Sequence, residues 1–519
     1  MATPQEKLAE SLDALKALQD RGVVAIRATD LSRAHRERLL KNGFLQEVMK
    51  GWYVAARQDD AAGESTAWYA SFWSFCAAYL RERFGSEWCL SPEHSLSLHT
   101  GNHAVPPQLV VRSPKGGNKA TMFPYGTSLL DVRAAVPNEK DIEEKESLRL
   151  FSLPAALIAS SPALFEHNPT DARAALAAIR DASEVLDRLL EGGHSKIAGR
   201  LAGAFRNIGR DRIADDIVSA MRAAGYTVRE QDPFASRINL VLPLREASPY
   251  AGRIRLMWQQ MRGPVIEKFP ASPEQRPEIT AYLKHVQEVY VTDAYHSLSI
   301  EGYRVNPGLI ERVRSGTWNP DANEQDREHR NALAARGYWL AFQAGQKSLR
   351  RVLSGENPGT VAEEDHGAWY REMFAPSVTA GLLRPADLAG YRNAPVYIRR
   401  SMHVPPNYGA VRDAMPVFFE ILTQEAEPAV RVVLGHFIFV YIHPYIDGNG
   451  RIGRFLMNVM LAAGGYPWTV VPLERRDAYM AALEDASVRQ NIAPFAEFLA
   501  QLVEEGLSGK PVAKVPEPK

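Results

Sequence analysis

Two apolar segments of helical length flank a short polar run, and this pattern constrains the fold of the chain more than any other feature. The apolar segments cover residues 429–442 and 455–463, and the polar run covers residues 443–454. The polar run reads His-Pro-Tyr-Ile-Asp-Gly-Asn-Gly-Arg-Ile-Gly-Arg. Apolar runs of this length and spacing are typical of buried helices. The sequence therefore predicts two buried helices joined by a polar loop at the N-terminus of the second helix.

The loop carries residue types that suit a phosphate group. The first N–H groups of a helix lack backbone partners, and the helix dipole is positive there. Gly448 and Gly450 allow the backbone to approach an anion closely. Asp447 offers a carboxylate of the kind that Mg²⁺ binds. Arg451 and Arg454 lie three residues apart on one helix face and can fork onto phosphate oxygens.

His443 opens the run and is the natural general base, because the ordinary pKa of histidine lies near neutrality. A His-Pro pair or an Asp-Gly-Asn-Gly turn is usually structural when it occurs alone. The complete run resembles the signature of the Fic family, His-Pro-Phe-x-Asp/Glu-Gly-Asn-Gly-Arg-x-x-Arg, with Tyr445 in place of Phe. The resemblance covers residues 257–507. It implies an all-α Fic fold with a β-hairpin flap in the C-terminal half.

By this resemblance, the reaction transfers AMP from ATP to a Ser, Thr or Tyr hydroxyl of a target protein and releases pyrophosphate. His443 deprotonates the hydroxyl, Asp447 binds Mg²⁺ at the α- and β-phosphates, and Arg454 meets the γ-phosphate. Gly450 favours AMP transfer, because Fic relatives that act as kinases carry Lys there. The other implied nucleotide contacts are Gly448, Asn449, Gly450 and Arg451 around the phosphates, and Tyr479 against the adenine.

A second cluster, at residues 297–302, reads Ser-Leu-Ser-Ile-Glu-Gly. Taken alone, it is the end of a helix, with Gly302 just beyond the last turn. In a chain with the Fic signature it resembles the inhibitory motif Ser/Thr-x-x-x-Glu-Gly/Asn. This resemblance implies that the Glu301 carboxylate pairs with Arg454 and takes the place of the γ-phosphate. Ser297 would brace the helix against the loop.

A third segment, residues 390–400, is followed by two prolines at 405 and 406. Val396 and Ile398 alternate with Tyr397 and Arg399, which predicts a short strand bounded by prolines. The segment resembles the Fic flap. That resemblance implies that it pairs with an extended target segment by strand addition and that its backbone contacts the nucleotide.

Composition sets the wider bounds. A chain of 519 residues predicts two to four domains. Lys plus Arg and Asp plus Glu both number 61, so the net charge points neither toward nucleic acid nor away from it. Two cysteines without metal-ligand spacing favour a reducing cytoplasm. No signal peptide and no 18-residue apolar run is visible, so we expect no membrane span.

The N-terminal residues 7–57 predict a winged helix-turn-helix. Leu12, Leu15 and Leu18 form an apolar stripe on a first helix. Thr29 or Asp30 is expected to cap a second helix. Residues 43–45 and 50–54 are expected to form the strands of the wing.

The second helix of this domain is basic, with Arg33, Arg36 and Arg38 on its polar side. Such a helix is most often a solvated face. The ordered set of elements resembles the N-terminal domain of AbiEi-type antitoxins, which implies that this part binds DNA and regulates transcription.

The predicted fold is multidomain and mainly α. The predicted parts are a winged helix-turn-helix at 1–60, an AbiEi-like α+β region at 61–138, a helical connector at 139–250, the Fic domain with its inhibitory helix at 251–508, and a tail at 509–519. Three functions stay open: a protein adenylyltransferase, a hydrolase that removes AMP at the same site, and a DNA-binding regulator whose Fic half senses nucleotide. The assembly is open as well, a homodimer included.

Overall fold

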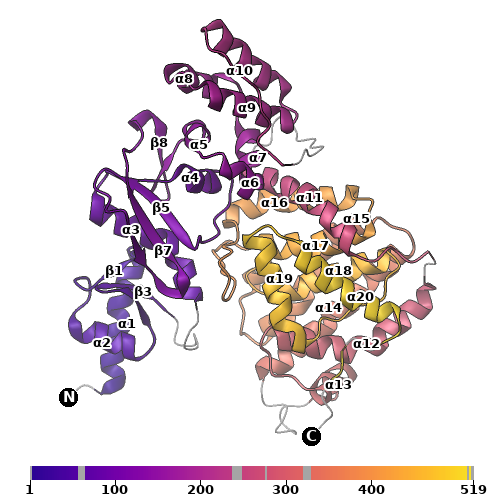
Figure 1. The fold of residues 1–519 in the computed structure, drawn as a ribbon. Helices are drawn as coiled ribbons and strands as arrows, with labels where there is room; N and C mark the ends of the chain where they lie inside the picture. The colour runs from indigo at the N-terminus through magenta and orange to yellow at the C-terminus, as the bar shows by residue number, and fades with distance from the viewer. Residues whose placement is uncertain are drawn as a thin grey trace. The chain divides into compact units, whose positions relative to one another are not determined.

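The computed structural model describes residues 3–56, 65–235, 248–274, 277–318, 329–510 and 513–515. The chain divides into two compact units (Figure 1). The first comprises Met1–Pro249 and a short inserted piece, Tyr397–Val404. The second comprises Tyr250–Val396 and Pro405–Lys519. The predicted tail at 509–519 lies mostly outside the described residues.

The first unit begins with two helices, α1 (Pro4–Asp20) and α2 (Arg33–Lys41), and a small antiparallel sheet. Its strands β1 (Ile26–Arg27), β2 (Leu45–Met49) and β3 (Trp52–Ala55) lie in the order β1-β3-β2. The predicted helices are thus present, and the two wing strands begin two residues later than predicted, at Leu45 and Trp52 instead of residues 43 and 50. The predicted cap of α2 was wrong: Ser32 accepts a hydrogen bond from the His35 N–H at 3.2 Å, whereas Asp30 accepts from the Arg27 N–H.

A four-stranded mixed sheet follows. Helix α3 (Thr66–Phe84) leads into β4 (Cys89–Leu90), α4 (Pro92–His99), β5 (Gln108–Ser113), β6 (Lys119–Met122) and β7 (Ser128–Arg133). The strand order is β4-β5-β7-β6, and β5 and β7 run parallel. The aromatic side chains of α3 form much of the core beneath this sheet. Cys76 and Cys89 are buried free thiols.

The segment predicted as a helical connector begins with a hairpin, which is a correction. Strands β8 (Ile142–Lys145) and β9 (Leu148–Phe151) pair antiparallel. Glu146 and Ser147, between them, both have positive φ, 51° and 65°. Two such residues in succession form the kind of tight turn that suits the twist of a hairpin. The helices that follow are α5 (Leu153–Ala159), α6 (Ala163–His167), α7 (Pro169–Ala178), α8 (Ser183–Glu191), α9 (Ser195–Asn207) and α10 (Asp211–Ala223).

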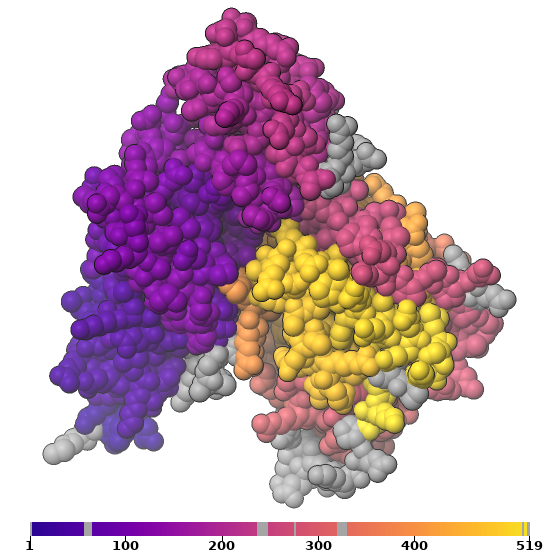
Figure 2. Space-filling model, in the orientation of Figure 1, coloured from indigo at the N-terminus to yellow at the C-terminus, as the bar shows by residue number. Residues whose placement is uncertain are grey.

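In its described residues, the second unit contains helices joined by loops and has no strand. Its helices are α11 (Pro249–Lys268), α12 (Ile279–Ile300), α13 (Pro307–Ser315), α14 (His329–Leu353), α15 (Pro358–Thr379), α16 (Tyr408–Gln424), α17 (Pro428–Ile442), α18 (Asn449–Ala463), α19 (Arg476–Val488) and α20 (Ala493–Leu507). In the space-filling view, the C-terminal helices, in yellow, form the central part of the face of this unit that is turned toward the reader (Figure 2).

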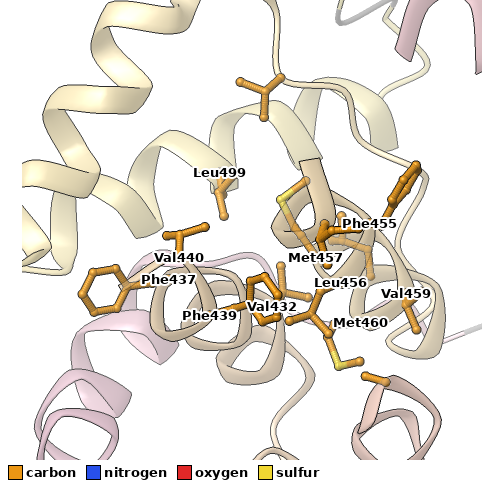
Figure 3. Close-up of a cluster of buried hydrophobic side chains, with 14 of the residues drawn as sticks. Val432, Phe437, Phe439, Val440, Phe455, Leu456, Met457, Val459, Met460 and Leu499 are labelled. Atoms are coloured by element: carbon orange, nitrogen blue, oxygen red, sulfur yellow. The ribbon is translucent and has the colours of Figure 1, made fainter. Parts of the chain in front are cut away.

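Helices α17 and α18 form the centre of the second unit, as the two apolar segments predicted. Figure 3 shows their side chains packed together with Leu499 of α20. The labelled residues are Val432, Phe437, Phe439 and Val440 from α17, and Phe455, Leu456, Met457, Val459 and Met460 from α18. This packing fixes both ends of the loop that joins the two helices. None of the described helices is long and apolar enough to cross a membrane.

The predicted β-hairpin flap was wrong. The structure describes residues 390–407 and gives them turns and bends but no strand. Pro395, Pro405 and Pro406 have no N–H to donate to a ladder. Arg400 has a φ of 60°, and the Ser401 N–H closes a turn onto the Ile398 carbonyl at 3.2 Å. These features bend the chain where the alternating pattern predicted a straight strand.

Candidate active site

The loop between α17 and α18 is bounded by two residues with left-handed backbone. His443 ends α17 with φ 54° and ψ 60°, and Gly448 precedes α18 with φ 82°. The conformation is free of strain for glycine but unfavourable for histidine. The His443 ring is half-buried, and its Nδ1 lies 3.1 Å from the Val440 carbonyl oxygen.

That contact assigns the proton of His443. A carbonyl only accepts, so Nδ1 carries the hydrogen and Nε2 keeps its lone pair. Burial lowers the pKa of His443 to about 4. The ring is therefore neutral at pH 7, with Nε2 ready to accept a proton, as a general base requires.

Asn449 holds the loop closed. Its side-chain Oδ1 accepts from the Tyr445 N–H, and its Nδ2 donates to the Tyr445 carbonyl, both at 2.8 Å. The Tyr445 ring stacks on Tyr370 at 3.9 Å between centroids, with an interplanar angle of 5°. Tyr445 therefore keeps the aromatic anchor of the signature, and the Asn449 side chain is committed to loop structure.

Asp447 and Arg451 form an ion pair at the start of α18. Asp447 Oδ1 lies 3.1 Å from Arg451 Nη2 and accepts from the Gly448 N–H at 2.6 Å. The Asp447 side chain is 61% exposed, whereas the Arg451 guanidinium is buried against the rings of Tyr303 and Phe374. An exposed carboxylate held in place beside a fixed cation suits a divalent ion shared with a phosphate.

This site lacks the set of side chains that would bind a metal ion through protein ligands alone. Among the described residues, no group of three or more His, Cys, Asp or Glu side chains could hold a metal ion. Mg²⁺ commonly takes one or two carboxylates and completes its coordination with water and substrate phosphates. The single carboxylate of Asp447 fits that pattern.

Glu301 and Arg454 are brought together from segments far apart in the sequence. Arg454 Nη2 donates to Glu301 Oε1 at 2.7 Å and to the Ser297 carbonyl at 3.0 Å, and Arg454 Nε donates to Ser297 Oγ at 2.9 Å. The Arg454 side chain is 4% exposed and that of Glu301 is 26% exposed. Burial lowers the pKa of Arg454, but the neighbouring Glu301 carboxylate raises it, and the pKa of Arg454 stays above its ordinary value.

Gly450 makes room for this carboxylate. A Cβ at position 450 would lie 2.4 Å from Glu301 Oε1. No side chain at this position fits without moving Glu301. The ion pair between Glu301 and Arg454 thus depends on glycine at position 450. No local sequence signal shows this dependence.

The sequence did not reveal a buried acid beneath the ion pair. Asp293 lies on α12, and its Oδ2 accepts from the Tyr338 hydroxyl at 2.6 Å. Burial raises the pKa of Asp293 to about 6, and the Arg454 charge opposes that rise. With Ser297 and Glu301, Asp293 follows four-residue spacing along one helix face. An acid four residues before Ser297 in an apolar stretch was the available signal.

The remaining predicted contacts are less direct. Tyr479 is buried, its hydroxyl lies 2.7 Å from His436 Nε2, and its ring packs near Phe495 and Phe498. Contact with an adenine stays a prediction that requires this ring to be uncovered.

The four predicted flap contacts are divided between the units. Val396 belongs to the second unit, whereas Tyr397, Ile398 and Arg399 belong to the first. Their contact with a nucleotide stays a prediction.

Part of the chain is similar to known proteins. Residues 362–461 match the model of the Fic/DOC family. The chain contains a Fic domain. Protein adenylyltransferase Fic of Drosophila grimshawi is 31% identical over 235 residues, which is 44% of this chain and 45% of that protein. Protein adenylyltransferase fic-1 of Caenorhabditis elegans is 26% identical over 225 residues, 43% of this chain and 41% of that protein.

The chain spans less than half the length of these curated relatives. Among solved structures, Fic-1 of C. elegans, residues 134–508, aligns at 19% identity with a TM-score of 0.36, covering 65% of this chain and 96% of that one. The family match, residues 362–461, lies within the second unit except for the inserted piece Tyr397–Val404, which belongs to the first unit.

Proposed function

We propose that this protein is an adenylyltransferase that moves AMP from ATP to a Ser, Thr or Tyr hydroxyl of a target protein, and that Glu301 holds its basal activity low. The observation that carries the proposal is the complete loop, with a neutral His443 and an Arg454 already paired with Glu301. The named activity of the curated relatives supports the same reaction class.

The residues of the loop divide the work. Nε2 of His443 accepts the proton while the target oxygen bonds to the α-phosphorus, and the bond from that phosphorus to the bridging oxygen breaks to release pyrophosphate. The N–H groups at the start of α18 and the Arg451 guanidinium suit the phosphate charges. Asp447 would hold Mg²⁺, which offsets phosphate charge when bound.

Inhibition follows from competition for one guanidinium. Arg454 is the residue that the γ-phosphate would meet. In this structure, its Nη2 already donates a hydrogen bond to Glu301. ATP must displace the carboxylate or bind without that contact. Productive binding is therefore disfavoured until Glu301 moves.

The test uses purified full-length protein with labelled ATP and Mg²⁺, read by intact mass. Glu301→Gly is expected to gain AMP by self-modification, and the wild type far less. Glu301→Gly with His443→Ala is the matched control and should gain none. A Glu301→Gly protein that binds ATP but transfers no AMP to itself or to any protein of a lysate would contradict the proposal.

One observation favours a second activity at the same site. The Glu301 carboxylate is partly exposed and lies directly beside the Gly450 backbone. A carboxylate there can orient a water toward the phosphorus of an AMP-modified side chain, so that the bond from phosphorus to the side-chain oxygen breaks and the hydroxyl and AMP are released. Under this reading, a modified target would lose AMP with the wild type and keep it with Glu301→Gly.

The first unit supports a separate proposal, that it binds DNA in the cytoplasm as a regulator. Its support is that two helices, α1 and α2, accompany a three-stranded sheet, as the predicted winged helix-turn-helix requires. Arg38 Nη1 is used internally, on the Lys7 carbonyl at 2.5 Å, and Arg36 Nη1 donates to the Ala28 carbonyl at 2.7 Å. Arg33 is the most exposed candidate, although it pairs with Glu37 at 2.7 Å.

A further inference from the structure

The buried guanidinium of Arg392 donates hydrogen bonds to the carbonyl groups at the end of α17. The Arg392 side chain donates from Nε to the His443 carbonyl at 2.8 Å and from Nη2 to the Ile442 carbonyl at 3.5 Å. The Arg392 backbone N–H donates to the Pro444 carbonyl at 2.9 Å. The last carbonyls of a helix lack intrahelical partners, and a cation suits the negative end of the helix dipole. Arg392 is therefore the cap of the helix that carries the base.

The same guanidinium holds the segment that follows it. Nη1 donates to the Ala394 carbonyl at 3.2 Å, and Nη2 donates to the Pro406 carbonyl in a short contact. These two carbonyls lie on either side of the piece Tyr397–Val404, which belongs to the first unit. Arg392 itself is 1% exposed. One side chain thus bonds the His443 carbonyl and two further carbonyls of the second unit, one before and one after the inserted piece in the sequence.

His443 needs such support. Left-handed backbone is unfavourable for a residue with a Cβ and persists where the surroundings hold it. The Val440 carbonyl fixes the ring through Nδ1, and Arg392 fixes the peptide through the His443 carbonyl. Together they set the direction of Nε2.

We propose that Arg392 is a positioning residue for the general base: it holds the His443 peptide in its left-handed conformation, and so aims Nε2 at the target hydroxyl. Arg392 touches neither the nucleotide nor the target in this role. The catalytic part of the inference rests on the AMP-transfer function proposed above, whereas the effect on the His443 ring does not.

The charge of Arg392 provides a second readout, the pKa of the His443 ring, which is measured separately from the rate. Burial is the largest cause of the low pKa of His443, and the Arg392 charge lowers that pKa further. The carboxylates of Glu301 and Asp447 face the same ring and raise the pKa. Removing the guanidinium charge therefore raises the pKa of His443, and the acid limb of the rate moves to higher pH.

The experiment compares Arg392→Met and Arg392→Lys in the Glu301→Gly protein. A misplaced base costs on the order of 10²-fold in rate. We expect kcat to fall by roughly that factor in both variants, with the KM for ATP nearly unchanged. The acid limb should move to higher pH in Arg392→Met only, because lysine keeps the charge but cannot reproduce the fork. Arg253→Met is the matched control, since Arg253 is equally buried and bonds the Tyr441 hydroxyl of the same helix.

An activity-independent measurement separates the two proposals. The pKa of the His443 ring, followed by NMR and assigned by the loss of its signal in His443→Gln, should rise in Arg392→Met and not in Arg253→Met. An unchanged ring pKa together with an unchanged kcat overturns the inference. A parent Glu301→Gly protein that transfers no AMP overturns the proposed function, and the ring titration still decides the role of Arg392. If Arg392→Met does not fold, unchanged kcat in Arg392→Lys overturns the inference.

Discussion

Replacing Glu301 with glycine removes the competitor for Arg454 and should release AMP transfer. The bond to be lost is a charge-assisted one of 2.7 Å on a side chain that is 4% exposed. Hydrogen bonds to charged groups contribute roughly 1.5–3 kcal/mol. At 1.4 kcal/mol for each factor of ten, productive ATP binding should improve by roughly 10- to 140-fold. The Ser297 contacts of Arg454 do not depend on Glu301 and should persist.

The assay is initial-rate self-modification with labelled ATP at a concentration below saturation. Thermal unfolding gives an independent check: ATP should raise the Tm of Glu301→Gly more than that of the wild type, because a ligand stabilises the form that binds it. Glu301→Gln should show a smaller release, and Glu311→Gln, which removes a carboxylate paired with Arg314 on the surface, should show none. Equal rates in wild type and Glu301→Gly would refute the competition, and Glu301 would then be an ordinary residue at a helix end.

Four further outcomes are expected. In the Glu301→Gly background, His443→Ala should lower transfer by on the order of 10²–10⁴ while ATP binding, measured by calorimetry, is kept; undiminished labelling would rule out His443 as the base. In the same background, Asp447→Ala should weaken the response of the rate to added Mg²⁺, and full transfer in excess EDTA would contradict a metal role. Gly450→Ala alone should raise basal self-modification above wild type, because its Cβ would lie 2.4 Å from Glu301 Oε1; a rate equal to wild type would show that the carboxylate is not displaced. The 519-residue chain should retard its own promoter fragment on a gel at low salt, and its affinity for that DNA should fall steeply as the salt concentration rises. Arg33→Ala should bind the DNA more weakly. No retardation at any salt concentration would favour a protein-interaction role for the first unit.

The loop between α17 and α18 was predictable because the sequence signals that define it are local. Apolar periodicity fixes α17 and α18, and twelve consecutive residues, 443–454, carry the polar groups between them. The pairing of Glu301 with Arg454 was also within reach, since a known motif pattern joins two distant segments. The cap of α2 was missed by two or three residues because Thr29, Asp30 and Ser32 are all good capping types, and only the fold decides which one begins the helix.

The rest depended on tertiary contacts. The alternation at residues 396–399 is a genuine strand pattern, but prolines and the left-handed Arg400 bend the chain there. Arg392 reads as an ordinary surface arginine in the sequence, and only the fold brings the carbonyls of α17 to it. Asp293 shows the same limit, since its hydrogen bond to Tyr338 joins helices 45 positions apart.

The inserted piece Tyr397–Val404 has a consequence for how this protein can be cut. The chain passes between the two units at three places, after Pro249, after Val396 and after Val404. Met402 and Val404 pack against the aromatic core of the first unit, and the Met402 carbonyl accepts from the Val105 N–H at 2.8 Å. A fragment that starts at Tyr250 would therefore carry two apolar side chains without their packing partners, and the complementary fragment would lose part of its own wall. Dissection at the single linker near residue 249 yields two incomplete bodies, and an intact first unit needs the inserted piece supplied in trans.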